Sequence, residues 1–167
     1  MKRGTFGTCL LIAAAVVLIL RPWEDGTGND GPATATAYVV RVVDGDTIEA
    51  RIGNRVEDVR YIGVDTPETV KPGAPVQCFG PRASSFNHRL VERRRVRLVF
   101  GVERRDAYGR LLAYVYLGDR FVNADLLQRG LARSLTIPPN DRFAPQFRRL
   151  ELRAARAGRG LWGACTP

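Results

Sequence analysis

Three short β-rich runs separated by tight turns begin the body of the chain, and no other feature constrains the fold as strongly. These runs cover residues 38–43, 47–52 and 56–62. The Asp-Gly and Gly-Asn pairs between them favour tight turns, so the pattern predicts a meander of three antiparallel strands. Two further runs, 96–100 and 111–117, are strand candidates. Five short strands predict a small closed barrel.

Segments with helical spacing of apolar residues are interleaved with these strands. Residues 81–93 place apolar side chains on one face after a proline in the first turn. Asn123 is placed to cap a short helix that ends at Gly130. A third helix ends at Gly158, and its apolar stripe is Phe143, Phe147, Leu150 and Ala154. The predicted fold class is α+β, a β-barrel with three packed α-helices.

Residues 1–21 have the features of an export signal. Lys2 and Arg3 precede an almost uninterrupted apolar run over 6–20, and Arg21 follows it. The run spans about 22 Å as a helix, less than the roughly 30 Å hydrocarbon core of a bilayer, which favours a signal peptide. No small-x-small cleavage site follows at once, so an uncleaved membrane anchor through residues 4–21 stays open. Either form places the protein outside the cytoplasm, secreted or tethered.

The rest of the chain divides into a linker and one basic domain. Residues 22–36 are rich in Gly, Asp, Thr and Pro without periodicity, which predicts a flexible linker before a folded domain over 37–167. Lys+Arg 26 against Asp+Glu 17 gives a formal net charge of +9. Such a positive field favours anionic partners, either nucleic acid or acidic lipid.

Histidine and cysteine counts limit the chemistry. One histidine and three cysteines exclude metal sites built from several histidines or from four cysteines. The chemistry is therefore left to carboxylates and arginines, with or without a hard metal ion. Cys78 and Cys165 are the cysteines of the predicted domain, and an exported pair is commonly a disulfide. Two separate thiols are the alternative.

Three polar motifs follow predicted strands: Asp-Gly-Asp-Thr at 44–47, Asp-Thr-Pro-Glu-Thr at 65–69 and Asp-Ala-Tyr-Gly-Arg at 106–110. Taken singly, each is compatible with an ordinary turn or helix start. Together with Leu-Ala-Tyr at 112–114 and Gly-Leu-Trp at 160–162, they resemble the staphylococcal nuclease (thermonuclease) family from about residue 40 to 162. The resemblance implies a five-stranded OB-fold β-barrel with three packed α-helices.

The resemblance also implies a role for each motif residue. Asp46, Asp65 and the backbone carbonyl of Thr66 correspond to ligands of a calcium ion, a hard cation that prefers oxygen. Asp44 is expected to support the turn instead. Glu68 corresponds to the general base for the attacking water.

Three further residues are implied to contact the substrate. Arg60 and Arg110 correspond to an arginine pair on the scissile phosphate, where two guanidinium forks bind phosphoryl oxygens. Tyr108 corresponds to a tyrosine that lies along the nucleotide.

Two departures from the family pattern concern substrate binding. Ala107 stands where a lysine reaches a terminal phosphate, and residues 133–138 are one residue short and lack two tyrosines that line the base pocket. Stacking of a base on an aromatic ring is worth about 1–3 kcal/mol. Substrate affinity, base preference and the balance between endonuclease and exonuclease action are therefore not fixed by the resemblance.

The function expected from the resemblance is calcium-dependent hydrolysis of phosphodiester bonds in DNA and RNA. We expect a monomer that favours single-stranded or frayed duplex substrates. The alternative is a non-catalytic OB-fold module that binds nucleic acid or protein.

Overall fold

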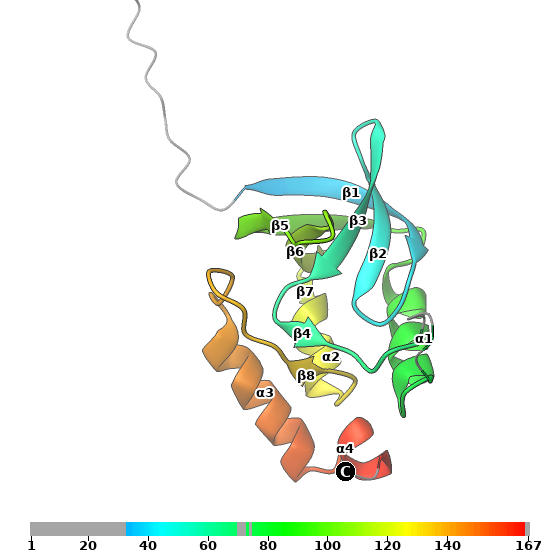
Figure 1. Cartoon of the computed structure of the whole chain (residues 1–167), viewed down its shortest axis with the longest axis vertical. Coiled ribbons are helices and arrows are strands. Elements are labelled where there is room, and N and C mark those ends of the chain that lie inside the picture. Colours follow the sequence, from blue (N-terminus) through cyan, green and yellow to red (C-terminus); the bar gives the residue numbers. More distant parts are fainter. Residues whose placement is uncertain (1–32, 70–72, 74, 166–167) are drawn as a thin grey trace, which may run out of the picture. The chain divides into compact units, whose positions relative to one another are not determined.

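The computed structural model in Figure 1 describes residues 33–69, 73 and 75–165. The predicted leader over 1–21, with its alternative as an anchor, and most of the predicted linker lie outside the described residues. Among the residues that are described, no helix is both long and apolar enough to cross a membrane.

A five-stranded barrel forms the centre of the domain. One sheet has the order β3-β2-β1-β5-β6-β7, and a parallel pairing of β3 with β6 closes it. The strands are β1 Thr34–Val42, β2 Thr47–Ile52, β3 Arg55–Tyr61, β5 Arg95–Arg105, β6 Leu111–Leu117 and the short β7 Arg120–Phe121. The prediction of a five-stranded barrel is confirmed. β1 begins at Thr34, within the stretch predicted as linker.

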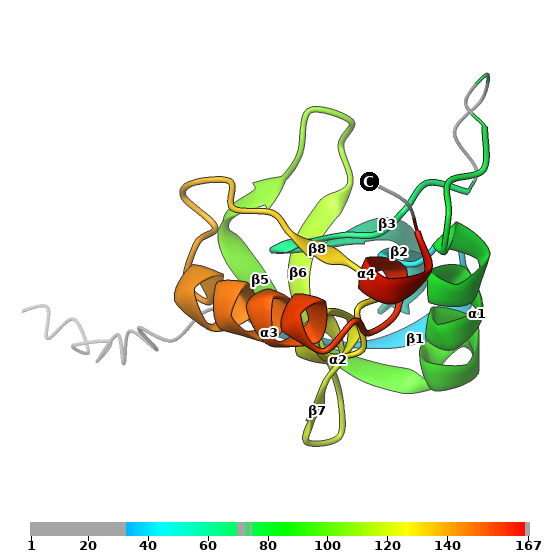
Figure 2. The same ribbon diagram turned by 90° about the horizontal axis from the view of Figure 1, so that it is seen from below.

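Three main helices pack around the barrel, as predicted, and the structure adds a short helix and a pair of two-residue strands. The helices are α1 Gly80–Val91, α2 Val122–Gln128 and α3 Ala144–Arg156. A single-turn helix, α4 Leu161–Ala164, lies between α3 and α1 (Figure 2). β4 Val64–Asp65 pairs antiparallel with β8 Arg133–Ser134. Two-residue strands are too short to produce a periodic signal, so the sequence did not reveal them.

Aromatic contacts join α3 to the barrel. Tyr114 of β6 meets the Phe143 ring edge to face, with 4.8 Å between centroids, and Phe147 is fully buried beside them. Gly63, with φ of 79°, leaves the space that the Phe147 ring fills. Burying a phenylalanine side chain contributes about 2–3 kcal/mol.

Asn123 does not cap α2, which corrects the sequence prediction. The helix begins at Val122, and Phe121 is its N-cap without a side-chain hydrogen bond. The Asn123 side chain is fully buried: its Oδ1 accepts the Val115 N–H at 2.9 Å, and its Nδ2 donates to the Ile62 carbonyl at 2.8 Å. One amide thereby joins β6 to the turn after β3, and the chain leaving β3 is fixed.

A second buried amide ties α1 to the turn after β1. The Tyr61 hydroxyl donates to Asn87 Oδ1 at 3.0 Å, and Asn87 Nδ2 donates to the Asp44 carbonyl at 3.1 Å. Burial raises the pKa of Tyr61 far above its usual value, so the hydroxyl keeps its proton for this bond.

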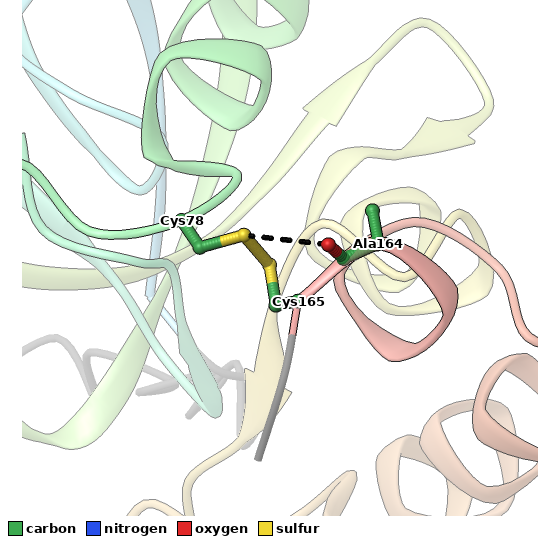
Figure 3. The surroundings of a disulfide bond; sticks show 3 residues. All are labelled: Cys78, Ala164 and Cys165. Carbon is green, nitrogen blue, oxygen red and sulfur yellow. Dashed lines mark hydrogen bonds between the residues drawn. A yellow bond between two sulfur atoms is a disulfide. The ribbon is translucent and has the colours of Figure 1, made fainter.

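The predicted disulfide is confirmed. Cys78 and Cys165 are bonded, with 5.9 Å between their Cα atoms (Figure 3). The bond joins the loop before α1 to the residue that follows α4. With a sequence separation of 87 residues, the chain-entropy model gives about 4–5 kcal/mol of stabilisation.

We expect Asn123→Ala to lower the free energy of unfolding by about 2–4 kcal/mol, because the Val115 N–H and the Ile62 carbonyl are left buried without partners. Chemical denaturation measures this change. Gln128→Ala removes an exposed amide from the same helix and should change stability by less than about 0.5 kcal/mol. Equal effects of the two substitutions would contradict the structural role of Asn123.

Candidate active site

The Asp-Gly-Asp turn is built so that the second acidic motif packs directly against it. Asp44 Oδ1 accepts the Asp46 N–H at 3.0 Å, which supports the turn as expected for Asp44. A Cβ at Gly45 would lie 2.6 Å from Thr66 Oγ1. Glycine is therefore needed here because the segment after β4 approaches too closely for any side chain.

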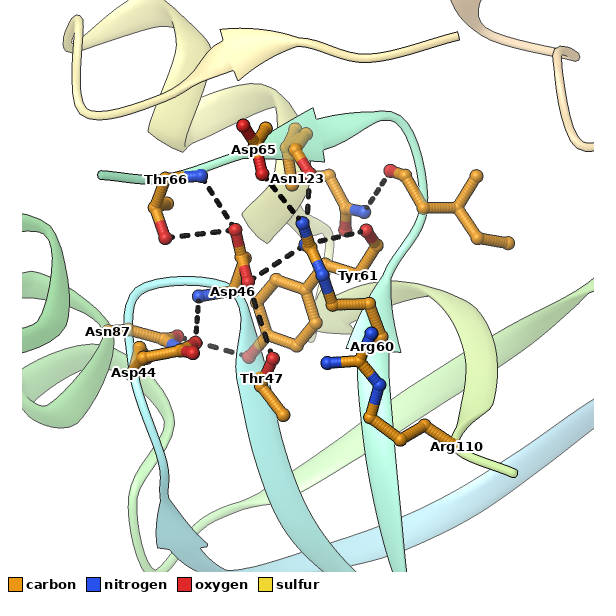
Figure 4. A network of polar contacts seen from close by, with 12 residues as sticks. Asp44, Asp46, Thr47, Arg60, Tyr61, Asp65, Thr66, Asn87, Arg110 and Asn123 are labelled. Carbon is orange, nitrogen blue, oxygen red and sulfur yellow. Dashed lines mark hydrogen bonds and ion pairs between the residues drawn. The ribbon is translucent and has the colours of Figure 1, made fainter. Parts of the chain in front are cut away.

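Asp46 is the buried centre of the site. The residue is 3% exposed, and its Oδ2 accepts the Thr66 N–H at 2.6 Å and the Thr66 hydroxyl at 2.9 Å. Its Oδ1 forms an ion pair with Arg60 Nη1 at 2.8 Å (Figure 4). One carboxylate thus connects the start of β2, the end of β3 and the segment after β4.

Arg60 bridges two carboxylates. Its Nη2 lies 3.0 Å from Asp65 Oδ1, and its Nη1 also donates to the Val64 carbonyl at 2.9 Å. The Arg60 side chain is 14% exposed, whereas that of Asp65 is 57% exposed. Asp46 and Asp65 therefore share the Arg60 guanidinium. Asp46 contacts it from the buried side, and Asp65 contacts it from the solvent side.

The buried carboxylate is electrostatically unusual. Burial raises the pKa of Asp46 to about 7, and the charge of Asp44 acts in the same direction. The Arg60 guanidinium and the hydrogen bonds from Thr66 oppose this rise. A carboxylate held in this way is stabilised strongly by any additional positive charge placed beside it.

The donors in this corner suit a hard cation. Asp46, Asp65 and the Thr66 carbonyl supply oxygen alone, the ligand that calcium and magnesium prefer. Within residues 33–69, 73 and 75–165, no three side chains of His, Cys, Asp or Glu gather closely enough to hold a metal by themselves. The Asp46 and Asp65 carboxylates meet at the Arg60 guanidinium, whose positive charge offsets theirs.

Arg110 is held by a residue whose role the sequence did not reveal. Asp106 Oδ2 lies 2.7 Å from both Nε and Nη2 of Arg110. Asp106 Oδ1 accepts the N–H groups of Tyr108 and Arg110, each at 3.0 Å. Asp106 and Arg110 flank the turn between β5 and β6, where the Asp106 N–H also donates to the Arg110 carbonyl at 3.0 Å, so their side chains lie close together. An acid and an arginine at the two ends of a predicted tight turn are the signal in the sequence.

The two arginines lie on the same side of the barrel. In the parallel β3–β6 pair, Arg60 is opposite Leu112. Arg110 precedes Leu112 by two residues, and side chains two apart in a strand share a face. Both arginines line one cavity of about 340 Å³.

The remaining walls of this cavity combine one exposed aromatic ring with aliphatic side chains. Tyr108 is 86% exposed, and its ring centroid lies 5.4 Å from the Arg110 guanidinium carbon. Leu135 and Ile137, in the segment that lacks tyrosines, line the opposite part. These side chains are aliphatic, so Tyr108 is the exposed aromatic ring among the residues that line the cavity.

Glu68 is fixed by the loop that leads into α1. Its N–H donates to Gln77 Oε1 at 3.0 Å, and its carbonyl accepts the Gln77 N–H at 2.9 Å. A Cβ at Gly80 would lie 3.0 Å from the Glu68 carbonyl, so the start of α1 packs directly on this segment. These contacts do not join Glu68 to Arg60 or Arg110, and its role as a base stays a prediction.

Comparison with known proteins places these features in context. The model of the family described as staphylococcal nuclease homologue matches residues 58–164. The chain is 42% identical over 167 residues to a thermonuclease of Staphylococcus intermedius, covering 97% of this chain and 99% of that protein. It is 37% identical to a thermonuclease of Staphylococcus hyicus with the same coverage. It is 44% identical over 124 residues to the endonuclease YncB of Bacillus subtilis, covering 73% of this chain and 59% of that protein.

We expect the metal-free protein to lose stability as the pH rises from about 4 to about 7. Because the folded state holds a proton on Asp46 that the unfolded state releases near pH 4, stability from this group is complete below about pH 4 and lost through about pH 7. Denaturation in chelator across this range measures the slope. Asp46→Asn should remove this contribution, and an identical slope in both proteins would contradict the assignment.

Proposed function

The chain belongs to the staphylococcal nuclease family, and from this premise we propose that it is a calcium-dependent nuclease that hydrolyses phosphodiester bonds of both DNA and RNA. The observation that carries the proposal is the convergence of Asp46, Arg60 and Asp65 beside the cavity that Arg110 also lines. Family membership supports hydrolysis of phosphodiesters; calcium and the inclusion of RNA are the finer parts of the proposal.

The two arginines bind the scissile phosphate. Arg60 and Arg110 line the same cavity, and a guanidinium is a planar fork of N–H donors that matches phosphoryl oxygens. Negative charge grows on the phosphoryl oxygens in the transition state, so donors that are already oriented stabilise that state more than the ground state. A lysine in either place keeps the charge but loses the fork.

Asp46, Asp65 and the carbonyl of Thr66 hold the calcium ion. When bound, the ion supplies positive charge that offsets the repulsion between these carboxylates and an incoming phosphodiester. The buried Asp46 remains anchored by the Thr66 N–H and hydroxyl, which orient the carboxylate before any ion arrives.

Glu68 accepts the proton of the attacking water. A carboxylate within hydrogen-bond reach of a water can orient and deprotonate it. The Gln77 and Gly80 contacts keep the Glu68 backbone in place, which supports a fixed position for such a base.

The substrate is a single strand or a frayed duplex end. Tyr108 is largely exposed at the cavity and offers a ring face to a base that has left its stack. We further propose that the nuclease works as a monomer outside the cytoplasm, either released after cleavage of residues 1–21 or tethered through residues 4–21.

Digestion of plasmid, single-stranded DNA and RNA tests the proposal. We expect cleavage of all three with calcium, none with chelator, and recovery when calcium is restored. Glu68→Gln should lower kcat by about 10²–10⁴-fold without loss of fold or of DNA binding. Asp119→Asn is the matched control at an exposed turn. Activity that persists in chelator rejects calcium dependence, and binding without cleavage in any condition favours the non-catalytic module.

Asp106 should act through Arg110 as a positioning residue. Asp106→Asn removes the ion pair but leaves an oxygen for the two backbone N–H groups, so we expect kcat to fall about 10–100-fold with little loss of stability. Arg110→Lys should cost about 10²–10³-fold. Because both changes disturb the same contact, the double variant should be no slower than Arg110→Lys alone by more than about threefold. Fully multiplicative losses would show that Asp106 acts separately.

A further inference from the structure

A second basic surface lies outside the cavity described above. Residues of α1 and of the chain around the end of α2 line an open hollow of about 530 Å³, which we call the basic trough. Arg82, Phe86 and Arg89 form one wall, and Arg129 with Gly160 forms the other. An adjoining hollow of about 470 Å³ shares Arg129 and Gly160 and adds Arg159. The trough shares no lining residue with the cavity of Arg60 and Arg110.

The positive charge of the trough is not neutralised by neighbouring acids. Arg82, Arg89, Arg129 and Arg159 are all exposed, and the ion pairs of the described residues include none of them. Asp125, the acid that lines the adjoining hollow, forms an ion pair with Arg120. Unpaired guanidiniums in a concave surface concentrate positive potential toward an anionic ligand.

Aromatic rings orient these arginines. The guanidinium carbon of Arg129 lies 5.0 Å from the Phe86 ring centroid, and that of Arg82 lies 5.1 Å from the Phe79 centroid. Arg120 also approaches Phe86, at 5.8 Å. A guanidinium that rests its face on a ring keeps its N–H edge available, and that edge matches two phosphate oxygens. Ordering the arginines in advance reduces the entropy lost when they bind.

Covalent and close contacts fix the width of the trough. Cys78 directly precedes Phe79 on one wall, and its disulfide partner Cys165 directly follows α4 on the other side (Figure 3). On the second wall, the Gly160 and Gly130 backbones approach too closely for either residue to carry a Cβ. The two walls are therefore held at a constant separation.

The trough continues from the catalytic side of the molecule. Its α1 wall begins at Gly80, which packs on the carbonyls of Pro67 and Glu68. The segment that carries Glu68 thus lies against the first residue of α1, next to Phe79, which lines the trough. We propose that the trough binds the sugar-phosphate backbone of the same polynucleotide strand, beyond the bond that is cleaved. This inference rests on the proposed function.

A polynucleotide fits these features better than an acidic lipid surface. The arginines line the walls of a hollow, and a flexible single strand can enter a hollow, whereas a flat bilayer meets protruding side chains first. Contacts to phosphate alone carry no sequence information. The trough therefore increases the affinity for longer strands and does not select particular bases.

The test compares two double variants that remove equal charge. Arg89→Ala/Arg129→Ala alters the trough, and Arg51→Ala/Arg55→Ala alters two exposed arginines of the β2–β3 hairpin. Binding is measured in chelator to single-stranded DNA of about 30 nucleotides and of about 4, since OB-folds cover roughly 4–16 nucleotides. Loss of two phosphate contacts should weaken binding of the long DNA roughly 10- to 60-fold at 0.05 M salt. It should also lower the salt slope by roughly 1.4.

The control variant should weaken binding of the long DNA by less than about threefold, and binding of the short DNA should not change in either variant. With calcium, the trough variant should raise KM for the long DNA and leave kcat for both lengths unchanged. The cleavage and binding measurements separate the two proposals. Absence of all cleavage by the unaltered protein would reject the proposed function, and the binding comparison in chelator would still show whether the trough binds the strand.

Three results would contradict the proposal that the trough binds the sugar-phosphate backbone. Equal losses in both double variants would show a general effect of charge. A parallel loss of short-DNA cleavage would show that the substitutions disturb the active site. Unchanged DNA binding together with reduced binding to phosphatidylglycerol vesicles would assign the surface to a membrane instead.

Discussion

The buried carboxylate of Asp46 is the contact on which the arrangement of this site depends. It receives a guanidinium from the end of β3 and two hydrogen bonds from the segment after β4, so three stretches of chain meet at one side chain. A buried polar group is tolerated only when its hydrogen-bonding atoms have partners, and here the partners of Asp46 bring Arg60, Asp65 and Thr66 together. The bonds that satisfy the buried Asp46 carboxylate in the folded protein are thus the same bonds that assemble the residues of the candidate site.

The sequence predicted the barrel well because its strands are short, β-branched and separated by glycine turns. It predicted the helices from apolar spacing, yet it assigned Asn123 to a cap. An amide that follows a strand and precedes a helix has the same local pattern in either role, and only the tertiary partners Val115 and Ile62 distinguish them. Closure through the parallel β3–β6 pair is likewise a long-range contact without a local signal.

The site was predictable to the extent that its chemistry is local in sequence. Asp46, Asp65 and Thr66 stand in the sequence motifs, Arg60 came from the family resemblance, and the structure connects the four through hydrogen bonds and ion pairs. The contact of Asp106 with the Arg110 side chain was missed because the same carboxylate also accepts hydrogen bonds from the backbone of the turn. Those backbone bonds alone are a sufficient reason for an aspartate at this position. Glu68 comes from an equally clear motif, and the structure shows its N–H bonded to the Gln77 side chain and its Oε1 accepting the Thr69 N–H.

The disulfide between Cys78 and Cys165 also makes the stability of the domain depend on oxidation of the two thiols. A thiol pair oxidises outside the reducing cytosol, so the newly made polypeptide lacks this cross-link and the stability that the link adds. The reduced polypeptide is consequently the less stable form of the domain. Once the disulfide has formed, it restricts the conformations of the unfolded chain and thereby opposes unfolding.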